Sequence, residues 1–164
     1  MVKKILCIAF IAIMLVSCKT KNAFNYSQDI VKKETALVPA IEKAENEVAA
    51  FIEKEMYDSV ILASKRMETL VQKSIDEIKA TPAPEATGGD AFKAASLRYF
   101  EYLKSIYTSY VNYGKAATEE DRQTSVTAMM AIVDKKQSAI DDMQGAQRKF
   151  AKANGFQIEG EGKK

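Results

Sequence analysis

Apolar positions recur at helical spacing in four stretches of the chain, and almost nothing alternates in the manner of a β-strand. The first stretch carries a stripe of apolar residues three or four positions apart, with Glu34 in one slot: Ile30, Leu37, Ile41, Ala44, Val48 and Phe51. Pro39 lies opposite this stripe. We therefore expect one long helix that is bent at Pro39, with the proline facing solvent, and not a helix that ends there.

The second stripe predicts a helix that begins with Asp58 or Ser59 as its N-cap and ends near Ala80. Its members are Val60, Ala63, Met67, Leu70, Ser74 and Ile78. Residues 81–89 hold two of the three prolines of the chain and predict a loop.

The third stripe is rich in aromatic residues and predicts a helix that opens at Asp90 and stops near Gly114. Its members are Phe92, Ser96, Tyr99, Leu103, Ile106, Tyr110 and Tyr113. We expect these aromatic rings to pack in the core, and a groove for a lipid or aromatic ligand is the alternative.

The fourth stripe predicts one continuous helix, from a capping box at Thr118–Asp121 to a Schellman turn at Asn154-Gly155-Phe156. Its members are Val126, Met130, Val133, Gln137, Ile140, Met143, Gln147 and Phe150. The four helices together predict an all-α fold, an up-down-up-down antiparallel four-helix bundle over residues 25–157 with a flexible tail at 158–164. Two long hairpins that dimerise are the alternative. We expect a monomer and leave a dimer open.

The start of the chain has the pattern of a secretory signal peptide. Lys3 and Lys4 precede an apolar run over residues 5–16, which is too short for a membrane-spanning helix of about 20 apolar residues. The run ends in Leu15-Val16-Ser17-Cys18, which resembles the lipobox of bacterial lipoproteins.

This resemblance implies cleavage after Ser17, diacylglycerol on the Cys18 sulfur and acylation of the new amino terminus. It divides the start of the chain into a signal peptide at 1–17 and a lipidated tether at 18–24. Two or more acyl chains give durable membrane attachment. Lys19 stands where inner-membrane lipoproteins of well-studied Gram-negative bacteria carry an aspartate, so we expect a cell-envelope protein on the outer membrane.

The helical part also resembles helical surface lipoproteins of spirochaetes and Bacteroidetes, a family with no established activity. The matching residues are Asp29-Ile30-Val31, Gly89-Asp90, Gln147-Arg148-Lys149-Phe150-Ala151 and Asn154-Gly155-Phe156. This resemblance implies a helical fold and a surface location. It implies no biochemical activity.

Composition excludes several classes of function. The net charge of +2 comes from Lys3 and Lys4, so the remainder is neutral, which argues against a nucleic-acid partner. The chain has no histidine, the commonest general base and transition-metal ligand. We therefore expect no metal, no catalytic residue and no cofactor beyond the covalent lipid.

Four polar residues interrupt the apolar stripes where the interior of the bundle should be: Glu34, Ser74, Gln137 and Gln147. A buried polar group without a partner costs about 1–3 kcal/mol. We therefore expect these residues to form hydrogen bonds between helices that set the register of the bundle.

The favoured function is that of a non-enzymatic binding or structural module whose partners are the membrane, through the lipid, and an envelope protein or a small apolar ligand. A carrier of a small apolar ligand is one alternative, and an enzyme that uses only carboxylates is another.

Overall fold

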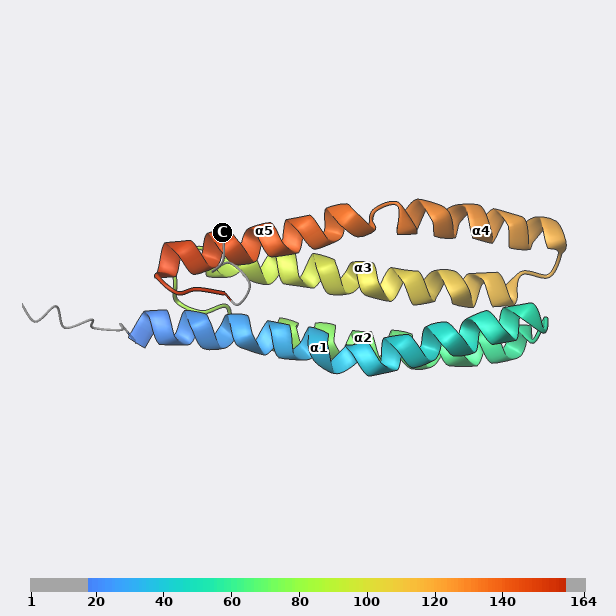
Figure 1. Ribbon diagram of the computed structural model, residues 1–164, viewed down its shortest axis with the longest axis horizontal. Helices are drawn as coiled ribbons and strands as arrows, with labels where there is room; N and C mark the ends of the chain where they lie inside the picture. The colour runs from blue at the N-terminus through green and yellow to red at the C-terminus, as the bar shows by residue number, and fades with distance from the viewer. Residues whose placement is uncertain (1–17, 159–164) are drawn as a thin grey trace, which may run out of the picture.

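The computed structural model describes residues 18–158, and within this range the chain is all-helical with no β-strand. These residues form α1 (Cys18–Glu53), α2 (Tyr57–Ala80), α3 (Gly89–Lys115), α4 (Glu119–Val133) and α5 (Lys136–Asn154). The helices lie roughly along one direction, with α4 and α5 following one another in line (Figure 1). The predicted signal peptide and residues 159–164 of the predicted tail lie outside the described residues.

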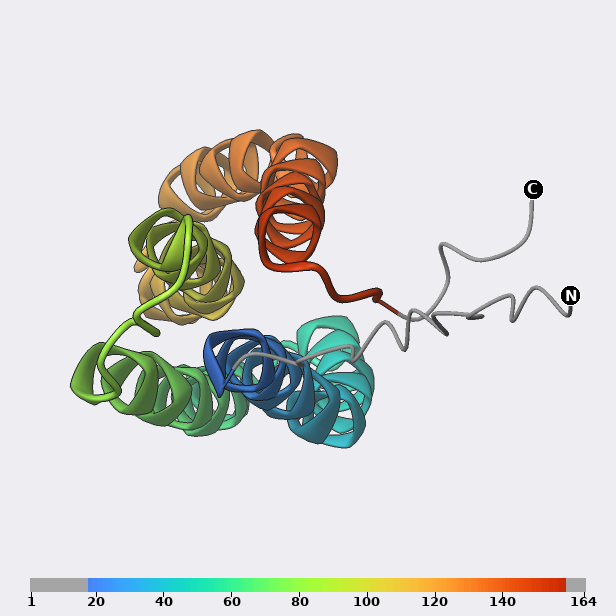
Figure 2. The same cartoon turned by 90° about the vertical axis from the view of Figure 1, so that its left-hand side faces the viewer.

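Four helices, α1, α2, α3 and α5, supply the buried side chains of the main core, so the all-α prediction is confirmed. The largest fully buried members of this core are Ile75, Ile78, Phe92, Phe100 and Phe150. A smaller cluster of Val48, Val60 and Ala63 lies where α1 turns into α2. Viewed end-on, α4 lies over α3, whereas α5 is turned toward α1 (Figure 2).

Helix α1 begins at Cys18, so residues 18–24 do not form a separate tether and the predicted boundary at residue 25 is wrong. Ala23 is fully buried, and Tyr26 is 8% exposed. These two residues extend the buried stripe toward the N-terminus at spacings of three and four, which keeps this turn helical. Further along α1, Pro39 is exposed and the helix continues through it, as predicted.

Helix α2 differs from the prediction at its start and on its buried face. Met56 occupies the N-cap position without a side-chain hydrogen bond, and neither Asp58 nor Ser59 is the cap. Leu70 is 42% exposed, whereas Val71 and Ile75 are buried. The other five predicted positions are buried, and packing against both α1 and α3 widens the buried face of α2 beyond the single predicted stripe. The predicted end at Ala80 is confirmed.

Helix α3 begins at Gly89, and its N-cap is Gly88 in the left-handed conformation (φ 80°), not Asp90. A Cβ at Gly89 would lie 2.4 Å from the carbonyl oxygen of Pro84. The two glycines therefore serve different purposes, a positive φ at Gly88 and a close approach of the loop at Gly89.

The predicted fourth helix is broken into α4 and α5 at Asp134 and Lys135. All side chains over residues 133–138 are exposed. No buried contact therefore holds this segment in a continuous helix. Helix α4 itself buries no residue, and its predicted core positions Met130 and Val133 are 63% and 49% exposed. The expected burial of this half of the stripe is therefore wrong.

Both predicted ends of this last segment are confirmed. Thr118 and Asp121 form the capping box at the start of α4. At the end of α5, Gly155 is left-handed (φ 70°), and the Phe156 N–H donates to the Ala151 carbonyl oxygen at 3.1 Å, as in a Schellman turn.

Candidate functional site

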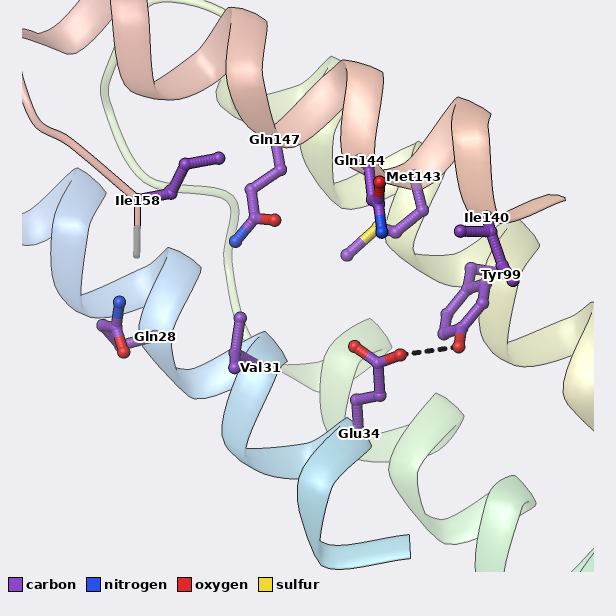
Figure 3. A pocket seen from close by; sticks show the side chains of 9 residues that line it. All are labelled: Gln28, Val31, Glu34, Tyr99, Ile140, Met143, Gln144, Gln147 and Ile158. Carbon is purple, nitrogen blue, oxygen red and sulfur yellow. Dashed lines mark hydrogen bonds between the residues drawn. The ribbon is translucent and has the colours of Figure 1, made fainter. Parts of the chain in front are cut away.

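A pocket of about 250 Å³ lies between α1 and α5, with α3 at its base. Its lining combines glutamine side chains and one carboxylate with aliphatic side chains: Gln28, Val31, Glu34, Tyr99, Ile140, Met143, Gln144, Gln147 and Ile158 (Figure 3). The volume is slightly below the range of about 300–1,000 Å³ that is usual for ligand pockets. The pocket therefore suits a small molecule and not a long acyl chain.

Glu34 enters this pocket from α1, and its carboxylate is held by Tyr99 of α3. The Tyr99 hydroxyl donates to Glu34 Oε1 at 2.6 Å. Burial raises the pKa of Tyr99, and the hydrogen bond to Glu34 raises it further, so this phenol stays a neutral donor. The second carboxylate oxygen of Glu34 points away from Tyr99 toward the pocket (Figure 3).

Gln147 reaches the pocket from the opposite wall, on α5. Its Nε2 donates to the hydroxyl of Ser27, which is fully buried on α1, at 3.1 Å. This bond uses one N–H of the amide, so the second N–H and the amide oxygen of Gln147 remain available to a ligand. Glu34 and Gln147 thus present two acceptors to one space from two helices (Figure 3).

Two of the four predicted interior polar residues therefore meet at this pocket, and both make the expected hydrogen bonds between helices. Ser74 is 9% exposed on α2 and does not line the pocket. Gln137 is exposed and donates to Asp141 on its own helix at 2.9 Å. Its predicted interior position is wrong because it lies in the exposed segment where α4 ends and α5 begins. Cys18 is the first residue of α1, and Ser17 lies outside the described residues.

Sequence reasoning missed Gln28 and Gln144, which complete the polar part of the lining. Their signal is that Gln144 lies three positions from Gln147 and Gln28 one position from Ser27, so that each is close in the chain to a residue of the hydrogen-bonded pair. That signal does not show that α1 and α5 face each other, which is decided by packing.

The aromatic side chains of α3 pack in the core, as expected. The rings of Phe92 and Phe150 are stacked with centroids 5.0 Å apart, and Tyr26 meets Phe92 edge-on at 6.0 Å. Of the aromatic residues of α3, Tyr99 alone lines this pocket. The pocket is therefore not an aromatic groove.

Residues 18–158 contain no group of three or more acidic, cysteine or histidine side chains placed to hold a metal ion. Each helix in this range is too short or too polar to span a membrane. Comparison of the chain with protein-family models, with curated proteins and with solved structures finds no match in any of the three.

Proposed function

We propose that this protein is a lipoprotein of the cell envelope, anchored on the outer membrane through Cys18, and that its helical bundle is a non-enzymatic module that binds a small molecule between α1 and α5. The lipobox-like sequence at residues 15–18 supports the anchor. The observation that carries the binding role is the pair of acceptors on Glu34 and Gln147, each held in place by a hydrogen bond to another helix.

The lining of the pocket supports binding over catalysis. Glu34 is its one carboxylate, and the remaining polar groups of the lining are glutamine amides and a tyrosine whose pKa is raised. Acid–base catalysis near neutral pH usually needs a titratable group tuned to that range. Amides and a fixed carboxylate instead orient a ligand by hydrogen bonds.

The connectivity of the bundle is, in this proposal, up-down-up-down and antiparallel, with α4 and α5 together as the fourth element. Ion pairs between the first two helices join Lys33 to Glu77 and, further along α1, Glu47 to Arg66. The partner number on α2 falls as the number on α1 rises, as between antiparallel helices. This pattern supports the proposed order.

The position of Cys18 gives the proposal a geometric consequence. Because α1 starts at this residue without a linker, Gln28 and Glu34 lie about 15 and 24 Å from the anchor along the helix. A lipid on Cys18 therefore holds the pocket close to the membrane surface, where it meets small molecules released at or passing through that surface.

Two experiments test the two halves of this function. Replacing Cys18 by alanine removes incorporation of an alkyne fatty acid in growing cells and leaves the precursor uncleaved, and label that persists on Cys18→Ala contradicts the anchor. For the binding role, native mass spectrometry of the protein purified from its membrane detects a bound small molecule, which the double variant Glu34→Ala/Gln147→Ala loses. A wild-type protein that carries no such molecule under these conditions contradicts the binding role.

A further inference from the structure

Glu34 places a negative charge in the pocket between α1 and α5, and no ion pair balances this charge within residues 18–158. Glu34 is the one charged residue of its lining. Within residues 18–158, Glu34 takes part in no ion pair, because the neighbouring Lys33 binds Glu77 and Lys32 lies 3.6 Å from Asp29. Tyr99 donates a hydrogen bond to Glu34 but contributes no charge.

The polar atoms that face the pocket suit a ligand that donates hydrogen bonds. The second oxygen of Glu34 and the amide oxygen of Gln147 are hydrogen-bond acceptors, and they lie on opposite walls of the pocket (Figure 3). The amides of Gln28 and Gln144 have both donors and acceptors and adapt to either kind of partner. An ammonium group has three donors and no acceptor, so it suits a site whose fixed polar atoms are acceptors.

The rest of the wall is apolar and suits a hydrocarbon body of limited size. Val31 comes from α1, and Ile140 and Met143 come from α5. A carboxylate or phosphate ligand would meet like charge at Glu34, and a purely apolar ligand would leave the oxygens of Glu34 and Gln147 without partners.

We infer that the pocket between α1 and α5 binds a small organic amine, whose ammonium group lies between Glu34 and Gln147 and whose apolar body packs on Ile140 and Met143. This inference rests on the proposed binding function and names its ligand class. It requires no covalent step.

The test uses three probes with one hydrocarbon body and different head groups, titrated into the purified full-length lipoprotein in detergent micelles. Isopentylamine carries the ammonium group, isopentyl alcohol is its neutral counterpart, and 4-methylpentanoate, which has the same isopentyl group, is its anionic counterpart. Calorimetry gives the affinities, and the methyl signals of Ile140 and Met143 in NMR locate the bound probe. We expect saturable binding of the amine, at least about tenfold weaker binding of the alcohol and none of the carboxylate, since a charge-assisted hydrogen bond is about twice as strong as a neutral one.

Glu34→Gln is the informative variant, because the amide oxygen still accepts from Tyr99 while the charge is gone. It should weaken amine binding at least about tenfold and leave alcohol binding within about twofold. Glu42→Gln is its control, since it removes the same charge from an exposed position of α1 outside the pocket, and should leave both affinities unchanged. A circular dichroism spectrum equal to that of the wild type confirms that each variant is folded.

Three outcomes overturn the inference: no saturable binding of the amine, equal binding of amine and alcohol, or equal effects of Glu34→Gln and Glu42→Gln. Each of these leaves the proposed function standing if a different small molecule is found on the purified protein by native mass spectrometry. If neither the amine nor any copurified molecule binds, the proposed binding function is wrong as well as the inference.

Discussion

Gly114 of α3 lies directly against Ile61 of α2: a Cβ at position 114 would be 2.7 Å from Ile61 Cγ1 and 2.9 Å from the carbonyl oxygen of Tyr57. Real Cβ atoms do not come this close to other heavy atoms, so the two helices approach here because position 114 has no side chain. The start of α2 and the end of α3 are further joined by the rings of Tyr57 and Tyr113, whose centroids are 6.0 Å apart.

Gly114→Ala should therefore destabilise the protein by about 1–3 kcal/mol, the usual cost of overpacking. Gly145→Ala is the matched change on α5, where a Cβ would meet nothing within 4 Å. Because alanine favours a helix over glycine by about 1 kcal/mol, Gly145→Ala should raise stability by up to that amount. Urea unfolding followed by circular dichroism measures both, and changes of the same sign would contradict this account.

The hydrogen bond from Gln147 to Ser27 is expected to stabilise the contact between α5 and α1. Gln147→Leu leaves the Ser27 hydroxyl buried without its partner and should cost about 1–3 kcal/mol. Ser27→Ala in the same chain should recover most of this loss, since both polar groups are then gone.

Ser64 provides the control for these two variants because its hydroxyl is fully buried and has no hydrogen-bond partner among residues 18–158. Ser64→Ala should keep or raise the free energy of unfolding. Equal unfolding midpoints for the wild type and Gln147→Leu would show that the Gln147–Ser27 bond contributes nothing.

Alkaline pH should destabilise the fold through its buried tyrosines. Burial, with a smaller contribution from Asp90, raises the pKa of Tyr26 to about 12, and burial also raises the pKa of Tyr107. An unfolded tyrosine ionises near pH 10, so the unfolded chain holds fewer protons than the folded one above that pH. The stabilisation is complete below about pH 10 and is lost as the pH rises toward about 12.

Thermal unfolding at a series of pH values measures this loss, and tyrosinate absorbance follows the ionisation. Tyr26→Phe should reduce the slope of stability against pH. It should cost little at neutral pH, because the Tyr26 hydroxyl has no hydrogen-bond partner within the described structure. A midpoint that is independent of pH between about 9 and 12 would contradict the role of these tyrosines.

Helix α4 should be the least protected helix in amide hydrogen exchange, because it buries none of its residues. Its start is held by the capping box of Thr118 and by Arg122, whose guanidinium lies 4.5 Å from the centroid of the Tyr57 ring. Thr118→Ala should cost about 1 kcal/mol and speed exchange in α4 while leaving α5 unchanged. Equal protection of α4 and α5 in the wild type would contradict this prediction.

Local signals in the sequence were sufficient for the all-helical fold and for some of the helix ends. The long first helix through Pro39, the capping box at Thr118 and the Schellman turn at Gly155 depend on residues within a few positions of one another, and all three are confirmed. The interior positions of two residues of the pocket were predicted in the same way, because Glu34 and Gln147 interrupt apolar stripes whose positions are set by helical periodicity.

Helical periodicity does not determine which apolar stripe packs against another helix. The apolar stripe of the last segment continues from α5 into α4, yet it is buried at Met143 and exposed at Met130, because α5 packs on α1 and α3 whereas α4 packs mainly on α3.

The sequence by itself thus determined an all-helical fold over residues 18–158, some of the helix ends and two of the polar residues between the helices, since these follow from interactions within one or two helical turns. Only the tertiary structure decided that Tyr99 donates to Glu34, that Ser27 accepts from Gln147 and that their free oxygens share one pocket. The physical reason is that these contacts join residues 65 and 120 positions apart, and their distances are set by how whole helices pack and not by any local pattern.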